Sequence, residues 1–418
     1  MKLATLGRLA VKHVRNTVAE EVYIKTGKDF TRPVSVYAIV NERCNYKCKY
    51  CEYWRLPNYV DEMTTEEWTN ALVSLKEFIG PYHVEFSGGE PYIKKGFLDI
   101  CKACHDNGIN WGVTTNGSAF SEKIINQTLD LKPFNINMSM DSHIAEIHNY
   151  ARGIEGSLEK ITKGIQMLIA ERNRRGMDFP VIIKPVVHKL NYKYLPDMVD
   201  WVKQLGATAI NMQPVDRWSG ETFDELWIGE ADIPALEEVA QELLRRKRAG
   251  DPILNSELLL NSWGKHYREE KAPADVMPCK VGMRNYFIRT NGDVEVCWYF
   301  PPIGNVKTQS ARDIWYSDLG TDRRAETTAC EKLCLYTCLS QKTVLDKAKM
   351  AVTLLTGNRG KNHSNRNESV QNLEVKHDKN IHLPILTPVG GHPKADNRVQ
   401  HPSLDQLRAN RAPKSTAV

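Results

Sequence analysis

The sequence lacks any long hydrophobic run and carries little net charge. No uninterrupted apolar stretch approaches the roughly 18 residues that span a bilayer. The first residues, MKLATLGRLAVKHVRN, hold no apolar core followed by a small-residue cleavage site, as a secretion signal would. The formal net charge is only +5, from 56 basic and 51 acidic residues, without a clustered basic stripe. We therefore expect a cytoplasmic protein that does not bind nucleic acid.

Aromatic residues are missing from the end of the chain. After Gly357 there is no Phe, Tyr or Trp, and the stretch is rich in Asn, His, Lys and Pro. A segment of this composition cannot bury enough apolar surface to fold by itself, so we predict that it is disordered. The whole chain is 41% hydrophobic and 26% charged, which is ordinary for a globular protein. Its 418 residues allow one large domain and one or two smaller units.

Short β-rich runs alternate with helical patterns between residues 34 and 215. The predicted strands are 35–40, 83–87, 111–115, 134–140, 181–187 and 209–215. The predicted helices are 64–80, 95–108, 121–131, 157–175 and 194–206. Strands that alternate with helices form a parallel sheet with right-handed crossovers. Six units predict an α/β fold, a partial (β/α)6 TIM-like barrel, with its chemistry at the C-terminal ends of the strands.

The barrel pattern is flanked by segments of different character. NYFIRTNGDVEVCWY reads as a β-hairpin with Asn291-Gly292 at its turn, and it opens a small α+β extension that is dense in cysteine. We expect an N-terminal segment at 1–33, a barrel core at 34–215, a helical connection at 216–278, the cysteine-rich extension at 279–345, and a helix followed by a disordered tail at 346–418.

The N-terminal segment has an amphipathic helical pattern. Its apolar residues recur near helical spacing, and its charges are basic: Leu3, Leu6, Leu9, Ala10, Val14 and Val18 against Lys2, Arg8, Lys12 and Arg15. A helix of this kind packs its apolar face on the main domain, which we favour. The alternative is peripheral contact with an anionic membrane surface or with a partner.

The ten cysteines are clustered rather than scattered. Cys44, Cys48 and Cys51 follow the first predicted strand, and three thiolates within eight residues of one loop can converge on a soft metal centre. Zinc normally requires a fourth protein ligand, which is missing nearby. An iron–sulfur cluster of the [4Fe–4S] type can leave one iron open for a small molecule. Spacing alone favours the cluster but leaves zinc open.

The C-x3-C-x2-C spacing, with Tyr50 before the last cysteine, resembles the signature of the radical S-adenosylmethionine (SAM) superfamily. The resemblance implies that Cys44, Cys48 and Cys51 hold three irons of a [4Fe–4S] cluster whose fourth iron binds SAM. It further implies reductive cleavage of SAM to a 5′-deoxyadenosyl radical that abstracts hydrogen from a substrate. An electron donor such as flavodoxin or ferredoxin would supply the electron.

Further segments match this family in the expected order. Ser87-Gly88-Gly89-Glu90-Pro91 ends the second predicted strand and is similar to the family's GGEP motif, which binds the methionyl amino group of SAM. Glycines let backbones approach closely, and Glu90 offers an acceptor to an ammonium group. Thr114-Thr115-Asn116-Gly117 ends the third strand and resembles the family's TNG turn.

Three more residues carry the resemblance. Ser139 and Asp141 end the fourth predicted strand, as in the S-x-D segment near the ribose, and Arg152 resembles an arginine that contacts the SAM carboxylate in relatives. Each also has a purely structural explanation. Ser139 and Asp141 can cap the following helix, and Arg152 can form an ordinary surface ion pair.

The C-terminal cysteines predict a second centre. Their arrangement is similar to the SPASM or twitch extensions of radical SAM enzymes, which bind auxiliary [4Fe–4S] clusters. The full SPASM pattern uses more cysteines, so we expect one auxiliary cluster with four of five ligands, Cys279 and Cys297 first: Cys279, Cys297, Cys330, Cys334 and Cys338. A structural zinc ion is the alternative.

The functional hypothesis is a radical SAM enzyme that oxidises or otherwise modifies an unidentified substrate. The segment before the first strand is short for a peptide-recognition domain, so we favour a small molecule over a ribosomally made peptide. A lipid-linked substrate is a further alternative because of the basic N-terminal helix. A non-catalytic iron–sulfur or zinc scaffold is the competing hypothesis from another class.

Overall fold

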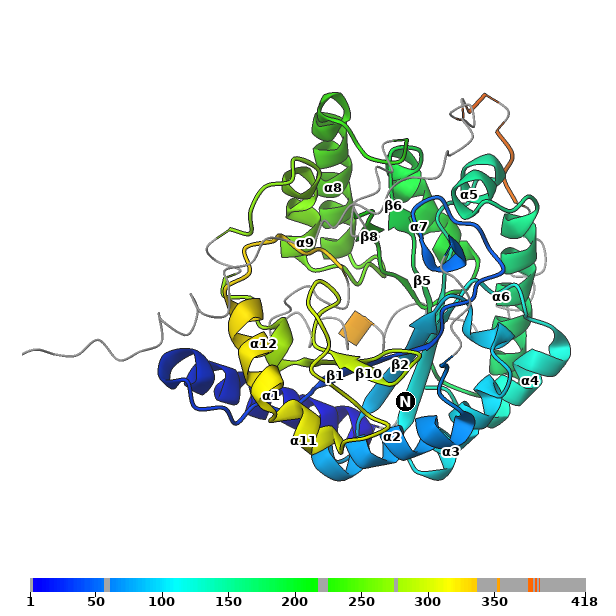
Figure 1. Ribbon diagram of the computed structural model, residues 1–418. Coiled ribbons are helices and arrows are strands. Elements are labelled where there is room, and N and C mark those ends of the chain that lie inside the picture. The colour runs from blue at the N-terminus through cyan, green and yellow to red at the C-terminus, as the bar shows by residue number, and fades with distance from the viewer. Residues whose placement is uncertain are drawn as a thin grey trace, which may run out of the picture.

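The computed structural model describes residues 3–55, 61–216, 225–273 and 277–336, together with short pieces at 352–353, 375–378, 380–381 and 383. A curved, mainly parallel sheet forms the interior and helices cover its outside (Figure 1). The sheet order is β11-β10-β9-β1-β2-β3-β4-β5-β7. This is the predicted α/β architecture, a partial TIM-like barrel.

The strands match the six predicted runs, but the last two runs are each split. Pro185 divides the fifth run, because proline has no amide hydrogen to continue the ladder. The pieces β6 and β8 pair with each other as a separate two-stranded sheet. The bounds in the barrel are β1 Ser35–Asn41, β2 His83–Gly88, β3 Asn110–Thr115, β4 Asn135–Met138, β5 Val181–Ile183, β6 Val186–Val187, β7 Ala209–Ile210 and β8 Gln213–Pro214.

The C-terminal extension continues the barrel sheet. Strand β9 (Asn285–Ile288) pairs in parallel with β1, and β10 (Asp293–Glu295) and β11 (Gly304–Asn305) follow as antiparallel strands. The predicted hairpin is therefore joined through its first strand to the edge of the barrel. This pairing places the cysteines of the extension beside the first barrel strand.

The helices pack on the outer face of the sheet, and local signals explain their limits. Thr64 and Glu67 form a reciprocal capping box at the start of α2, and Gly80 ends that helix at a φ of 69°. The helices are α1 Leu3–Thr26, α2 Thr65–Ile79, α3 Phe97–Asp106, α4 Glu122–Asp130, α5 Ala145–Arg152, α6 Ser157–Arg174, α7 Leu195–Gln204, α8 Ile233–Arg248, α9 Glu257–Asn261, α10 Trp263–Tyr267, α11 Ala311–Trp315 and α12 Asp318–Thr328.

The two faces of the barrel strands differ in polarity. Outward residues such as Phe86 and Val113 belong to the main hydrophobic core under the helices. The inward face is polar, although barrel interiors are usually filled by branched apolar residues. There the Glu85 carboxylate accepts hydrogen bonds from Thr114, Asn135 and Asn137 at 2.7–3.0 Å. The concave face is therefore built for polar contacts.

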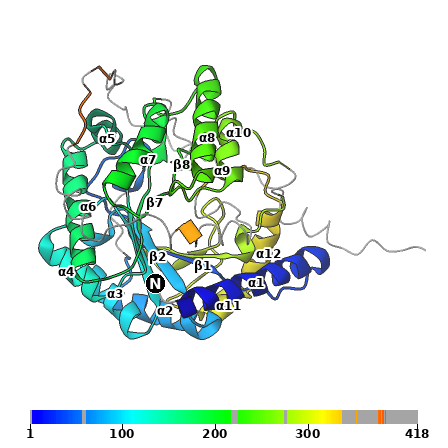
Figure 2. The ribbon, with the colours of Figure 1, turned by 180° about the vertical axis from the view of Figure 1, so that it is seen from behind.

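Helix α1 docks through a mixed face of Asn16, Ala19, Glu20 and Tyr23, and not through Val14 and Val18 of the predicted apolar face. Val11, Val14 and Val18 are 69%, 51% and 61% exposed, whereas Asn16 and Glu20 are buried. Figure 2 shows this helix at the outer edge of the molecule. None of the described helices combines the length and the apolar character that a membrane-spanning segment needs.

Polar contacts join α1 to the extension. Asn16 Nδ2 donates to the Met283 carbonyl at 2.9 Å, and Arg284 forms two hydrogen bonds of 2.6 Å with the Glu20 carboxylate. Buried polar groups need such partners, so this face must turn inward and the valines turn outward.

A short piece of the tail also lies on the core. Ile144 and Lys376 form a parallel β-bridge, and the Ala145 amide donates to the Lys376 carbonyl at 2.9 Å. These residues are ordered although they fall in the stretch predicted to be disordered, because backbone pairing with the start of α5 supplies the order that their composition does not. Most of that stretch lies outside the described residues.

The docking of α1 yields a first prediction. Glu20→Ala should lower the free energy of unfolding by about 3 kcal/mol, because it leaves the Arg284 guanidinium without its buried partner. Val14→Ser on the opposite face should change it by less than about 0.5 kcal/mol. Denaturant unfolding of both variants measures the difference. Equal effects would contradict docking through the face that carries Asn16 and Glu20.

Candidate functional site

The first three cysteines lie in the loop after β1, and that loop rests on the end of α5. Cys48 is buried, whereas Cys44 and Cys51 are partly exposed, and all three are free thiols. The Lys47 and Lys49 amides donate to carbonyls at the C-terminus of α5, at 3.2 and 2.9 Å. A Cβ on Gly153, the residue that ends α5, would stand 2.3 Å from the Lys47 carbonyl oxygen. Only glycine permits this contact.

The thiols of this loop suit an iron–sulfur cluster. Burial raises the pKa of Cys44 to about 11 and that of Cys51 to about 12, and the neighbouring Cys48 thiol also acts to raise both. Thiolates in such surroundings need a metal's positive charge. Among the described residues, no three ligand side chains gather around a point suited to a single ion. Thiolates of a cubane cluster bind different irons, so they need not converge on one point.

The two glycines before Glu90 pack against the start of the cysteine loop. A Cβ on Gly88 would lie 2.1 Å from the Asn41 carbonyl oxygen, and one on Gly89 would lie 2.1 Å from that of Arg43. The predicted close approach of a backbone is therefore present. Its partner in the structure is the chain that leads into Cys44.

Glu90 is completely buried at the end of β2. Its carboxylate accepts hydrogen bonds from the Thr115 hydroxyl and the Asn116 amide, both at 2.7 Å, and from the Tyr92 amide at 3.1 Å. Burial raises the pKa of Glu90 to about 7, although these donors act to lower it. A buried carboxylate with this pKa favours a cationic partner such as an ammonium group.

Asp141 and Arg152 form a buried ion pair rather than a surface one or a helix cap. Arg152 Nη2 donates a hydrogen bond to Asp141 Oδ1 at 2.9 Å, and Arg152 Nε lies 2.8 Å from Oδ2 in the ion pair. The Tyr50 hydroxyl donates to the same carboxylate at 2.6 Å and the Val186 amide at 2.9 Å. Burial alone would raise the pKa of Asp141, but the Arg152 guanidinium holds it below its ordinary value. Three hydrogen-bond donors and the ion pair fill this carboxylate, so it positions Arg152 and Tyr50 beside Cys48.

Ser139 lies near these groups, but its hydrogen bond is formed by its backbone and not by its side chain. Its amide donates to the Thr115 carbonyl at 2.9 Å, which continues the pairing of β3 with β4. Its side chain is partly exposed on the concave face. The structure thus brings Tyr50, Glu90, Ser139, Asp141 and Arg152 to the C-terminal ends of four neighbouring segments, around the cysteine loop.

Some residues of this site had no role assigned from the sequence: Thr115 and Asn116 were named only as part of the TNG turn, and Asn41 was not named. Thr115 and Asn116 hold Glu90, and Asn116 also donates to the Asn45 side chain at 3.0 Å. The TNG turn was the available signal for them. Asn41, which donates to the Glu90 carbonyl at 3.0 Å, had no local signal because the contact crosses between strands.

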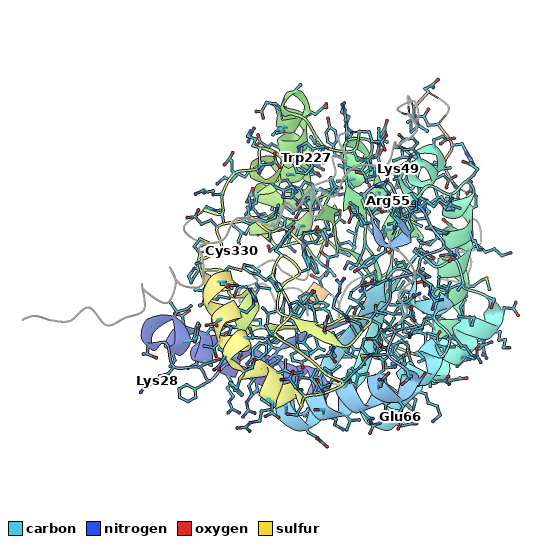
Figure 3. All side chains as sticks on the ribbon, viewed as in Figure 1. Lys28, Lys49, Arg55, Glu66, Trp227 and Cys330 are labelled. Carbon is cyan, nitrogen blue, oxygen red and sulfur yellow. The ribbon has the colours of Figure 1, made fainter. Side chains whose placement is uncertain are left out.

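The second centre lies in the C-terminal extension. Four cysteines share one apolar cluster with Phe287 and Phe300: Cys279, Cys297, Cys330 and Cys334. Cys338 lies outside the described residues. Burial raises the pKa of Cys279 to about 11, and the Cys330 thiol acts in the same direction. Figure 3 shows Cys330 well apart from Lys49 of the first cysteine loop, so the two groups form separate centres.

Family comparisons agree with both centres. The model of the radical SAM superfamily matches residues 38–202, which contain the cysteine loop and the residues around it. The chain contains a radical SAM domain. The model of the iron-sulfur cluster-binding domain SPASM matches residues 279–339, the segment of the second cysteine group.

Proteins of similar sequence carry different names. A PqqA peptide cyclase of Bradyrhizobium diazoefficiens is 23% identical over 290 residues, which cover 65% of this chain and 74% of that protein. An AdoMet-dependent heme synthase of Methanosarcina barkeri is 26% identical over 286 residues, which cover 65% of this chain and 79% of that protein.

Solved structures share the fold. Streptococcus suis SuiB bound to the precursor peptide SuiA superposes with a TM-score of 0.55 at 18% identity, covering 74% of this chain and 71% of that chain. The enzyme anSMEcpe with bound AdoMet gives 0.56 at 14% identity, covering 78% of this chain and 99% of that chain.

These findings establish a radical SAM enzyme whose cofactors are SAM and a [4Fe–4S] cluster, with auxiliary iron–sulfur binding in the SPASM domain. They argue against the alternative of a non-catalytic scaffold. They do not support the preference for a small molecule, because relatives are named for peptides as well as for heme. The substrate class therefore stays open.

The pKa of Glu90 yields a second prediction, for SAM binding in the absence of reductant. Below about pH 7 Glu90 is protonated and loses its attraction for an ammonium group, so SAM affinity should fall as the pH falls. We expect binding about fivefold tighter at about pH 7 than at about pH 6. Titration calorimetry measures it, and Glu90→Gln should bind weakly at both values. A pH dependence that persists in that variant would remove Glu90 from this role.

The glycine contacts yield a third prediction. Gly89→Ala places a methyl group against the Arg43 carbonyl, so it should destabilise the fold by about 1–3 kcal/mol and loosen the cysteine loop. Gly229→Ala is the matched control, because a Cβ there meets nothing within 4 Å. Iron content after anaerobic reconstitution and denaturant unfolding test both. Full iron retention and unchanged stability in Gly89→Ala would contradict the packing argument.

Proposed function

We propose that this enzyme cleaves SAM reductively at a [4Fe–4S] cluster held by Cys44, Cys48 and Cys51 and modifies its substrate by abstracting hydrogen. The observation that carries the proposal is the convergence of three buried or half-buried thiols with Glu90 and Arg152 at one end of the barrel. When bound, the cluster and SAM together supply a 5′-deoxyadenosyl radical. A flavodoxin or ferredoxin would provide the electron.

The residues of the chain would bind and orient SAM. Glu90 offers a negative charge to the methionyl ammonium group, and Thr115 and Asn116 keep its carboxylate in one orientation. Arg152 is held by Asp141 and offers a cation for the methionyl carboxylate. Ser139 offers its hydroxyl oxygen as an acceptor to the ribose, which leaves the hydroxyl hydrogen free to donate elsewhere. Fixed groups of this kind make the hydrogen transfer an effectively unimolecular step.

The second group of cysteines would hold one auxiliary [4Fe–4S] cluster. The described ligands are Cys279, Cys297, Cys330 and Cys334, and their shared apolar cluster supports this choice. Four cysteines would supply one thiolate to each of the four irons, which suits electron transfer rather than direct binding of a substrate. An electron released by an oxidised substrate would be accepted there.

Two substrate classes remain in the proposal. The first is a small molecule that the enzyme oxidises or otherwise modifies. The second is a ribosomally made peptide, and the names of the PqqA peptide cyclases and of SuiB with SuiA favour it. A lipid-linked substrate is a further alternative because of the basic N-terminal helix.

The two centres yield a fourth prediction. Cys48→Ala should abolish 5′-deoxyadenosine formation under dithionite and SAM while about four irons per chain remain at the auxiliary centre. Cys297→Ala should lose auxiliary iron and keep some uncoupled cleavage of SAM. The wild type should hold about eight irons per chain. Iron analysis and chromatography of the product test this.

Other results would contradict the assignment of the two cysteine groups. Formation of 5′-deoxyadenosine by Cys48→Ala would overturn the assignment of the first three cysteines. Product formation by a wild type with only about four irons would leave the catalytic centre and make the second site a zinc site or an empty one. Cys101→Ala, a buried cysteine of α3 outside both groups, is the matched control and should retain both clusters.

We also propose peripheral contact of α1 with an anionic membrane surface. The exposed side chains of Val11, Val14 and Val18 lie on one face of the helix. The first acidic residue of the chain is Glu20, whereas four basic residues precede it. This pairing of an apolar strip with cationic charge is typical of interfacial helices.

Vesicle binding tests this contact. The triple variant Val11→Ser, Val14→Ser, Val18→Ser should lose sedimentation with phosphatidylglycerol vesicles, which the wild type should retain, and neither should bind phosphatidylcholine alone. Serines on this face leave the Asn16 and Glu20 contacts intact, so the fold is kept. Unchanged sedimentation of the variant would contradict the proposal.

A further inference from the structure

Three neighbouring polar side chains on the concave face have no hydrogen-bond partner among the described residues. They are Ser139 after β4, Lys184 after β5 and Asn211 after β7, and each is partly exposed. Met138 pairs with Ile183, and Ile183 pairs with Ile210. Ser139, Lys184 and Asn211 each follow one of these paired residues directly. The Lys184 and Asn211 amides continue that ladder, at 2.9 and 2.8 Å. The three residues therefore form one row across adjacent strands.

The alternation of the strands turns this row inward. Ile183 and Ile210 belong to the main core under the helices, whereas Ile182 and Ala209 form a separate apolar group with Leu254. Side chains two residues apart share a face of a strand. Lys184 and Asn211 therefore project from the face of Ile182 and Ala209, inside the ring of helices that Figures 1 and 2 show.

The surrounding polar groups are already paired. The Glu85 carboxylate is filled by Asn135, Asn137 and Thr114, and Asp141 is filled by Arg152, Tyr50 and Val186. Lys184 acts on Glu85 through its charge but forms no ion pair with any described residue. The ammonium, amide and hydroxyl groups of this row thus have hydrogen-bond donors that no described residue uses. The oxygens of the nearby carboxylates, in contrast, already accept hydrogen bonds.

We infer that this row binds an anionic group of the substrate, a carboxylate or a phosphate. A charged donor flanked by two neutral donors matches the several acceptor oxygens of such a group. Ser139 belongs both to this row and to the residues around the SAM site. A group bound by the row would therefore lie beside the end of the site where the substrate reacts. The inference rests on the proposed function and narrows its substrate to an anionic compound or an acidic peptide.

Protection of Lys184 from chemical modification tests the inference. The reconstituted full-length enzyme with SAM and without reductant is treated with acetic anhydride, and acetylation of Lys184 is measured by mass spectrometry. Methyl phosphate or acetate should slow acetylation of Lys184, and glycerol should not. The exposed Lys189 serves as the internal control and should react equally in all cases. The anion that slows acetylation of Lys184 more shows whether the row prefers a phosphate or a carboxylate.

Variants of the neighbouring residue sharpen the test. Asn211→Ala should weaken protection on the order of tenfold, because one hydrogen bond to a charged ligand is lost. Asn211→Asp should abolish it, because a carboxylate then occupies the row. Unchanged acetylation of Lys184 in the wild type with both anions overturns the inference. Protection by SAM alone, compared with enzyme lacking SAM, also overturns it, because the row would then hold the carboxylate of SAM.

The outcome is separable from that of the proposed function. Formation of 5′-deoxyadenosine by the wild type without any anion tests SAM cleavage alone. An enzyme that cleaves SAM but shows no protection of Lys184 refutes the anion site only. An enzyme that shows protection but never forms 5′-deoxyadenosine refutes the proposed function only.

Discussion

The close approach of three backbone segments is the constraint on which the site depends. The cysteine loop is packed between the end of β2 and the end of α5, and a Cβ at Gly88, Gly89 or Gly153 would stand 2.1–2.3 Å from a carbonyl oxygen. Glycine is the residue that permits these contacts. Because Glu90 and Arg152 directly neighbour these glycines, the same packing sets the thiols and the charged groups relative to one another.

The charged side chains of the site fall into two kinds, those whose hydrogen-bonding positions the protein already fills and those that can still bind a ligand. Asp141 and Glu85 are carboxylates in which protein donors occupy the oxygens, so they hold other side chains in place. Buried charges are stable only when paired in this way. Glu90 is held by three donors but carries no cationic partner among the described residues, and Lys184 has no ion pair there. Charged groups without such a partner are the ones that can bind a ligand.

One continuous sheet relates the two cysteine groups. Since β9 pairs with β1, the SPASM segment begins at the edge of the barrel that also starts the first cysteine loop. Helix α1 adds contacts across this junction through Asn16 and Glu20. Backbone pairing and buried ion pairs both resist shear. The sheet thus holds the auxiliary cysteines at a set position relative to the catalytic loop.

Much of the fold and of the first centre could be predicted from the sequence. Alternating strands and helices are local periodicities, and Cys44, Cys48 and Cys51 lie within one loop, so short-range patterns contain them. The same holds for Glu90 and for the residues of the S-x-D segment. Their mutual contacts follow from the order of parallel strands, which brings strand ends together.

Tertiary structure alone decided the rest, because those features depend on contacts between distant segments. The inward face of α1 was set by Arg284, more than two hundred residues away, against the helix's own apolar pattern. Asn41 and Thr115 became parts of the site through neighbouring strands. The row of Ser139, Lys184 and Asn211 exists only where three strands lie in register. Periodicity determines which residues share an element, whereas register and packing determine which elements share a site.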